Sequence, residues 1–107
     1  MRGNATRASM DLEAKAGEAA GLLSLLANPH RLLILCNLMK HGEMQVGLLA
    51  KTIALSQSAL SQHLARLRAD GLVATRRDAQ AIYYRIVDRR VAKLLKALET
   101  VICKDFN

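Results

Sequence analysis

The sequence predicts a mainly helical domain with one β-hairpin near its C-terminal end, and three observations support this class. Five segments place apolar residues at helical spacing, and the apolar residues are mostly aliphatic, because only two Tyr and one Phe are present. Residues 82–87 instead alternate with a period of two, as a half-buried strand does. With 107 residues, 51% of them hydrophobic, the chain can form one domain with its own core.

An Asn-Pro pair separates the first two helices. Apolar residues recur at helical spacing over residues 11–27, which predicts the first helix. Asn28 can cap the next helix and Pro29 suits its first position, so this pair ends one helix and begins another. The second helix, His30 to about Lys40, is apolar nearly all round, and we expect it at the buried centre.

A helix-turn-helix arrangement is expected next. A short helix from about Gln45 to Thr52 is followed by a turn at Ala54-Leu55 and by a helix over residues 56–70. The Ser56 hydroxyl can accept a hydrogen bond from a free amide of the first turn. At about 100° per residue, one side of this helix is apolar and consists of Leu60, Leu64 and Leu67. A short helix, a tight turn and a second helix with a polar face form this motif.

The polar face of the second of these helices suits DNA recognition. Gln pairs with adenine, Ser contacts bases or phosphates, and Arg reads guanine or binds a phosphate. For an isolated helix of this composition, an ordinary solvated face would be the better interpretation. The segment that follows the helix instead favours DNA recognition. The helix residues expected to contact DNA are Ser56, Gln57, Ser58, Ser61, Gln62, His63 and Arg66.

That following segment has the pattern of a basic hairpin. Gly71 is expected to end the helix in a left-handed conformation. Two runs with strand character, residues 72–77 and 82–87, are joined by residues 78–81. A two-stranded basic hairpin directly after a recognition helix is a wing, so we predict a winged helix-turn-helix. The wing residues expected to contact DNA are Arg76, Arg77 and Arg85.

The first and last helices predict a homodimer. Asp88 can cap the last helix, whose apolar stripe consists of Val91, Leu94, Leu95, Leu98, Val101 and Ile102. Both terminal helices carry more apolar surface than the small central domain can cover, so a two-fold dimer with paired DNA-reading units is expected. Residues 10–107 are thus expected to form the DNA-binding and dimerisation domain, after a disordered N-terminal tail of residues 1–9.

The charge distribution indicates a nucleic acid as partner. The net charge is +7, and the segment 66–93, with eight basic and three acidic residues, holds +5 of it. A membrane partner is not expected, because no amphipathic basic helix and no apolar run of about 20 residues is present. The N-terminus lacks the apolar core of a signal peptide, so we expect the cytoplasm, where thiols are usually reduced.

Four segments of the chain resemble the ArsR/SmtB family of small dimeric repressors. Residues 27–35 resemble the segment after the family's first helix, residues 55–64 and 68–73 resemble its recognition helix and the entry to its wing, and residues 76–84 resemble the wing. The resemblance extends over roughly residues 15 to 104. It implies a repressor of transcription that binds double-stranded operator DNA as a homodimer.

No metal site and no cofactor are expected. Metal-sensing members of the family carry a Cys-x-Cys-type motif before the recognition helix, where this chain has residues 43–47 without a thiol. Other members bind zinc through Asp and His on their last helices, whereas here the last helix has Asp88 but no histidine. The three histidines, His30, His41 and His63, are scattered and lack ligand spacing.

Two cysteines remain as candidates for sensing, although small core residues are the common role of such cysteines. Cys36 is placed on a helical face with Leu32, Leu35 and Met39 and is expected to be buried, whereas Cys103 lies off the apolar stripe of the last helix. Their segments resemble those of a persulfide-responsive branch of the family. The resemblance implies that sulfane sulfur joins the two thiols by a disulfide or polysulfide bridge, which releases the operator and derepresses genes that handle sulfide and persulfide.

Several alternatives stay open at this stage. A winged-helix repressor of this family could respond to a general redox signal or to a metal instead. A thiol redox enzyme is the other class, but the sequence has no Gly-rich phosphate loop and no nucleophile with a base and an orienting group, so no enzyme is expected. Which thiol attacks first is also open, and access favours Cys103.

Overall fold

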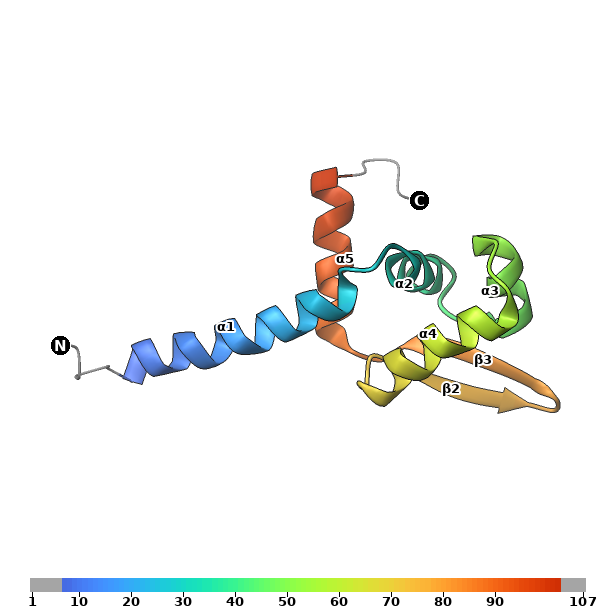
Figure 1. The fold of residues 1–107 in the computed structure, drawn as a ribbon, viewed down its shortest axis with the longest axis horizontal. Helices are drawn as coiled ribbons and strands as arrows, with labels where there is room; N and C mark the ends of the chain where they lie inside the picture. The colour runs from blue at the N-terminus through green and yellow to red at the C-terminus, as the bar shows by residue number, and fades with distance from the viewer. Residues whose placement is uncertain (1–6, 103–107) are drawn as a thin grey trace.

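The computed structural model describes residues 7–102, with side chains from Met10 onward, as five helices and three strands (Figure 1). The elements are α1 (Arg7–Leu26), α2 (Pro29–His41), β1 (Met44–Gln45), α3 (Val46–Ile53), α4 (Gln57–Ala69), β2 (Val73–Asp78), β3 (Ala81–Ile86) and α5 (Arg89–Ile102). This order confirms the winged helix-turn-helix. α1 begins at Arg7, inside the predicted N-terminal tail.

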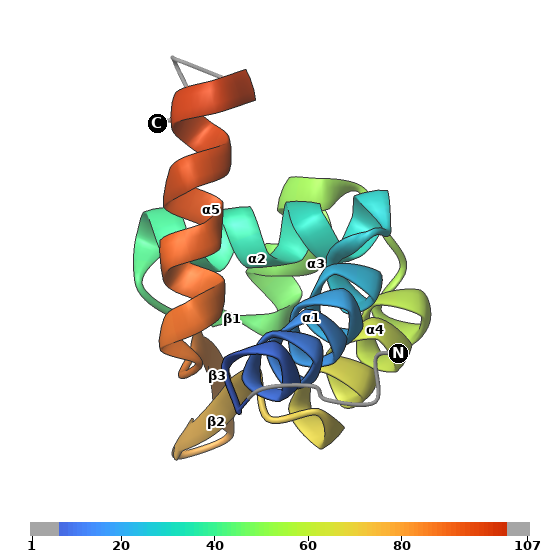
Figure 2. The same ribbon diagram turned by 90° about the vertical axis from the view of Figure 1, so that its left-hand side faces the viewer.

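The helices α2, α3 and α4 form the body of the molecule, and the other two helices lie to one side of it. α5 and the α3–α4 pair lie on opposite sides of α2 (Figure 1), and α5 crosses in front of α2 when the molecule is turned (Figure 2). α1 projects from the body, and its side chains from Met10 to Gly21 are all exposed. The hairpin of β2 and β3 lies along the same edge of the molecule as α4 (Figure 1).

The predicted helix caps are confirmed. The Asn28 side chain accepts a hydrogen bond from the backbone N–H of Arg31 at the start of α2. The Ser56 hydroxyl accepts one from the backbone N–H of Ala59 at the start of α4. After α4 the chain reverses through Gly71, whose φ of 77° is a conformation that glycine adopts without a steric penalty.

Leucines dominate the core. The fully buried side chains include three of α4, three of α2 and two of α5, so all three helices contribute to one cluster: Leu60, Leu64, Leu67, Ile34, Leu35, Leu38, Val91 and Leu95. The predicted apolar side of α4 is therefore confirmed as its buried side. The recognition helix is held by apolar burial, and its polar side is left for other contacts.

The sheet has one more strand than predicted. β3 lies in the centre and pairs antiparallel with β2 on one side and with the two-residue β1 on the other. The turn between β2 and β3 is also tighter than predicted, because Asp78 and Ala81 are still paired. The predicted two-stranded wing, β2 and β3, thus belongs to a three-stranded sheet. Pairing of β3 with β1 attaches the wing to the segment before α3.

None of the described helices is by itself long and apolar enough to cross a membrane. The segment Met10–Leu26 and α2 would reach that length and composition together, but they are bent by 93° at the break between them. α2 also carries Ile34, Leu35 and Leu38, which form part of the core.

Candidate nucleic-acid interface

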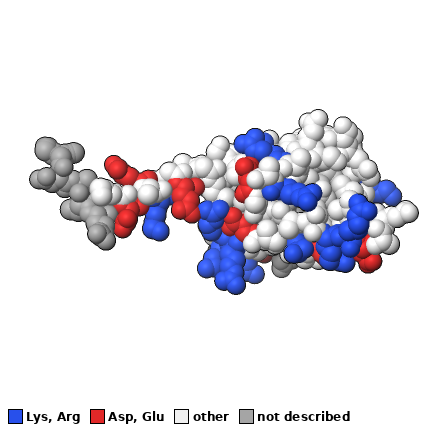
Figure 3. Space-filling view, turned by 90° about the horizontal axis from the view of Figure 1, so that it is seen from below, with Lys and Arg blue, Asp and Glu red and all other residues white. Residues whose placement is uncertain are grey.

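The polar side of α4 is exposed, as a DNA-reading face must be. Six of the seven helix residues expected to contact DNA are exposed: Ser56, Gln57, Ser58, Ser61, Gln62 and Arg66. The Nε of Arg66 donates to a carboxylate oxygen of Asp70 at 2.9 Å, one helical turn away. Seen from the side of α4 and the hairpin, Lys and Arg side chains form several groups with acidic side chains between them (Figure 3).

The turn before α4 sets the position of Gln57. Ala54 ends α3 in a left-handed conformation with a φ of 57°, and the backbone N–H of Leu55 bonds to the carbonyl of Ala50 at 3.0 Å. This tight turn brings Gln57 close to α3, where a Cβ added to Gly47 would lie 3.5 Å from the Gln57 Nε2. The first side chain of α4 therefore lies within van der Waals distance of the start of α3.

His63 lies differently from the other expected contacts. Its side chain is half-buried at the edge of the apolar face, and its ring lies beside that of His30 on α2, with the ring centres 5.6 Å apart. Burial lowers the pKa of His63, and the nearby positive charges of Arg31 and His30 lower it further. The ring is thus part of the contact between α2 and α4, and its role in DNA binding stays a prediction.

Arg76 is held by neighbours that the sequence did not reveal. Its Nε donates to one carboxylate oxygen of Glu43 at 3.2 Å, and its Nη2 donates to the other. Its guanidinium also lies over the ring of Tyr83, 4.6 Å from the ring centre. These hydrogen bonds lower the pKa of the Glu43 carboxyl and raise the pKa of Arg76. Glu43 lies 33 residues away in the sequence, so no local pattern could have predicted the pair.

The other two wing arginines are differently placed. Arg77 and Arg85 are exposed, and neither forms an ion pair within the described part of the chain. Arg85 is near enough to Glu43 for its charge to help lower that carboxyl's pKa. Of the three predicted wing contacts, Arg77 and Arg85 therefore present free cations, whereas the charge of Arg76 is paired.

The prediction that Cys36 is buried is wrong: its side chain is half-buried. The buried face of α2 consists of Ile34, Leu35 and Leu38. At about 100° per residue, Cys36 lies about 150° from the centre of that face, with Leu32 and Met39 as its neighbours. α2 is therefore apolar on two faces, and Cys36 lies on the one that is only partly covered. Cys103 lies outside the described residues, directly after the end of α5.

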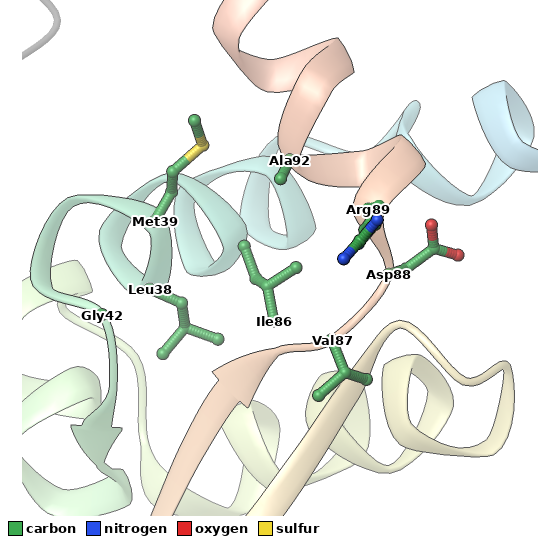
Figure 4. Close-up of a pocket in the computed structure, with 8 residues that line it drawn as sticks. All are labelled: Leu38, Met39, Gly42, Ile86, Val87, Asp88, Arg89 and Ala92. Atoms are coloured by element: carbon green, nitrogen blue, oxygen red, sulfur yellow. The ribbon is translucent and has the colours of Figure 1, made fainter.

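A hollow of about 250 Å³ lies where α2, β3 and α5 meet (Figure 4). Ile86 lies between Leu38 and Val87 in this view, and Met39 also lines the hollow (Figure 4). The hollow is lined by Leu38 and Met39 near the end of α2 and by Arg89 and Ala92 at the start of α5. It is open to solvent, so it is a depression in the surface at this junction.

Asp88 is occupied by contacts with its own segment. Its carboxylate accepts hydrogen bonds from the backbone N–H and the side chain of Arg90, which lower its pKa. Arg90 in turn donates to Glu18 of α1 at 2.7 Å, so this network joins α1 to the start of α5.

Among the described residues, no three His, Cys, Asp or Glu side chains are grouped so that they could hold a metal ion.

Comparison with known proteins identifies the family. The model of bacterial regulatory proteins of the arsR family matches residues 28–75. The nodulation protein NolR of Rhizobium meliloti is 59% identical over 87 residues, which cover 81% of this chain and 70% of that protein. The biofilm growth-associated repressor of Xylella fastidiosa (strain Temecula1) is 43% identical over 93 residues, which cover 87% and 81%.

A solved structure gives the same result. Reduced HlyU from Vibrio cholerae matches with a TM-score of 0.81 and 44% identity, over 87% of this chain and 97% of that one. The matched family consists of transcriptional regulators, not enzymes. The matched segment contains the helix-turn-helix described above and the beginning of the wing. The chain therefore belongs to the arsR family of bacterial regulatory proteins, which are DNA-binding regulators of transcription with a winged helix-turn-helix.

Proposed function

We propose that this protein is a repressor that binds operator DNA as a homodimer and releases it when persulfides oxidise Cys36 and Cys103. The partly exposed position of Cys36 on α2 is the observation that carries the thiol part of this proposal. A thiol sealed in the core could not meet a sulfur donor, whereas this one is within reach of solvent. Likeness to HlyU, whose structure is described as reduced, supports a function that depends on oxidation state.

In this proposal the exposed face of α4 reads bases and the wing binds phosphates. Gln57 and Gln62 can each donate and accept at an adenine edge, and the Ser hydroxyls between them can contact either bases or backbone. Arg77 and Arg85 present unpaired cations to the phosphates. The three buried leucines on the opposite side of α4 keep this face turned outward.

The homodimer is proposed from the apolar side chains that the two terminal helices leave exposed. On α5, Val101 and Ile102 are each 76% exposed, and on α1 Leu12 is 70% exposed. A mostly apolar hollow of about 470 Å³ between the same helices is lined by Leu22, Leu23 and Leu94, among others. Apolar surface of this extent on a chain of this size is typical of an interface.

The thiol chemistry balances without a further oxidant. One Cys thiolate attacks the terminal sulfur of a donor RS–SH, forms Cys–S–SH and releases RSH. The second thiolate attacks the inner sulfur of that persulfide, forms the disulfide and releases hydrogen sulfide, so the donor's sulfane sulfur is reduced as the two thiols are oxidised. If both cysteines first become persulfides, their condensation gives a trisulfide and hydrogen sulfide.

A bridge from Cys36 to Cys103 would connect α2 to the segment directly after α5. Because α5 is proposed to form the dimer interface, a change in its packing would alter the distance between the two recognition helices. That distance must match half-sites about 34–36 Å apart, so operator binding would weaken. The hollow at the junction of α2, β3 and α5 leaves open space beside the end of α2 and the start of α5.

The test combines mass and DNA binding. After treatment with an organic persulfide, the intact mass should fall by two hydrogens for a disulfide or rise by one sulfur less two hydrogens for a trisulfide. Fluorescence anisotropy should show release of an operator selected from random duplexes. Cys36→Ser and Cys103→Ser should fold and bind this operator but stay bound after treatment. Full release by either single variant would refute the two-thiol switch.

A further inference from the structure

Three side chains hold the Arg76 guanidinium. Its Nε and Nη2 contact the two carboxylate oxygens of Glu43, and its Nη1 lies 4.0 Å from the carboxylate of Asp78. Tyr83 covers one of its flat sides. Each guanidinium nitrogen therefore has a carboxylate nearby, a bidentate arrangement that is stronger and more directional than a single ion pair.

This contact crosses the sheet. Arg76 of β2 is paired with Tyr83 of β3, which is paired on its other side with Gln45 of β1. Glu43 lies just before β1, so the Arg76 side chain passes over the central strand to reach it. β1 has only two residues and gives a short ladder of backbone hydrogen bonds. The Arg76–Glu43 pair therefore adds a side-chain connection between the wing and the segment that leads into α3.

The pair also changes the charge that the wing presents. Three arginines and Asp78 give the hairpin, residues 73–86, a net charge of +2, and Glu43 reduces it to +1. A phosphate that displaced the Glu43 carboxylate from Arg76 would leave that carboxylate unpaired beside a polyanion. A free carboxylate close to a phosphate is repelled by it, so replacing Glu43 with a phosphate as the partner of Arg76 adds little to the affinity for DNA.

We propose that Glu43 is a positioning residue that holds Arg76 against the sheet, so that the wing offers one phosphate-binding cation fewer and binds duplex DNA of any sequence less tightly. The inference rests on the proposed DNA-binding function. It gives Arg76 a positioning role in the wing, in contrast to the direct contact expected from sequence. Arg77, its neighbour in the chain, keeps the direct role.

The test measures how affinity for a random-sequence duplex depends on salt, because each phosphate contact contributes about −0.9 to the slope of log affinity against log salt. Glu43→Gln should free Arg76, steepen this slope by about one and raise the affinity. Arg77→Gln should flatten the slope by about one, whereas Arg76→Gln should change it little. Glu13→Gln is the matched control, because it changes the net charge by the same amount but lies on the exposed part of α1. It should leave the slope unchanged.

Two results would overturn the inference. One is a slope for Glu43→Gln that equals that of Glu13→Gln, and the other is equal flattening by Arg76→Gln and Arg77→Gln. The double variant of Glu43 and Arg76 should return to the wild-type slope, and circular dichroism melts show which variants are folded. If the wild-type chain showed no salt-dependent binding to any duplex, the proposed DNA-binding function itself would be refuted. This outcome differs from the two above, in which the wild type binds DNA and only the slopes of the variants contradict the inference.

Discussion

Gln62 and Leu64 are two residues apart on α4 and face opposite ways. Leu64 has no exposed surface, whereas Gln62 is exposed. One packs in the core and the other is proposed to read a base, so alanine at each position should affect a different property. Leu64→Ala should lower the free energy of unfolding and spare DNA recognition, and Gln62→Ala should do the reverse.

The magnitudes follow from these positions. Leu64→Ala removes three carbons from a fully buried site, which costs about 2.4 kcal/mol at about 0.8 kcal/mol per buried methylene. The cavity left behind adds to this, so we expect a loss of about 3–4 kcal/mol in the free energy of unfolding. Gln62→Ala should change that free energy by no more than about 0.5 kcal/mol. It should weaken operator binding by about 1–3 kcal/mol, or about 5- to 150-fold.

Two assays separate the effects. Urea unfolding followed by circular dichroism, at one fixed protein concentration, gives the free energy of unfolding, and anisotropy gives affinity for a selected operator and for unrelated DNA. Leu48→Ala is the matched control for Leu64→Ala, because Leu48 is 56% exposed and its loss should cost little. Binding must be measured at a temperature where every variant is folded.

Specific results would refute the reasoning. If Gln62→Ala weakened binding to operator and to unrelated DNA equally, the exposed face of α4 would not read bases. If Leu64→Ala destabilised the protein no more than Leu48→Ala, the apolar side of α4 would not be packed in solution as it is in the structure.

Three further predictions concern charge, protons and association. Arg85→Gln should flatten the salt dependence of DNA binding by about one unit, and an unchanged slope would mean that this side chain points away from the phosphates. The pKa of His63 is lowered below 6.5 in the folded protein, so the unfolded chain takes up the proton more readily. The free energy of unfolding should therefore fall as the pH drops from about 6.5 toward the folded-state pKa. Urea titrations at about pH 5.5 and 7.5 should show a smaller difference in this free energy for His63→Gln than for the wild type. Val101→Lys should shift sedimentation from dimer to monomer, and an unshifted dimer would place the interface elsewhere.

The sequence was sufficient wherever a local pattern determines the structure. The caps at Asn28 and Ser56 and the three buried leucines of α4 follow from residue type and helical spacing alone. β1 was missed because two residues cannot show an alternating pattern, and its strand character comes from pairing with β3, far along the chain.

The exposure of Cys36 and the Glu43–Arg76 pair depend on tertiary packing. A helix that is apolar on two faces does not indicate which face the core will cover, so Cys36 was assigned to the wrong one. The ion pair joins residues 33 positions apart, and nothing near either residue predicts it. In both cases the missing information was the arrangement of elements around the site.

If the proposed homodimer forms through α1, the folding of this exposed part of α1 and the association of the two chains are one process. From Met10 to Gly21 no side chain is buried, and Gly17 and Gly21 lower the intrinsic helix propensity of this stretch. An isolated helix of about a dozen residues is marginal in water, so we expect this part of α1 to unwind when the two chains separate. Dilution would then remove ordered structure along with the interface. Circular dichroism near 222 nm would consequently report the amount of dimer as well as the amount of folded chain.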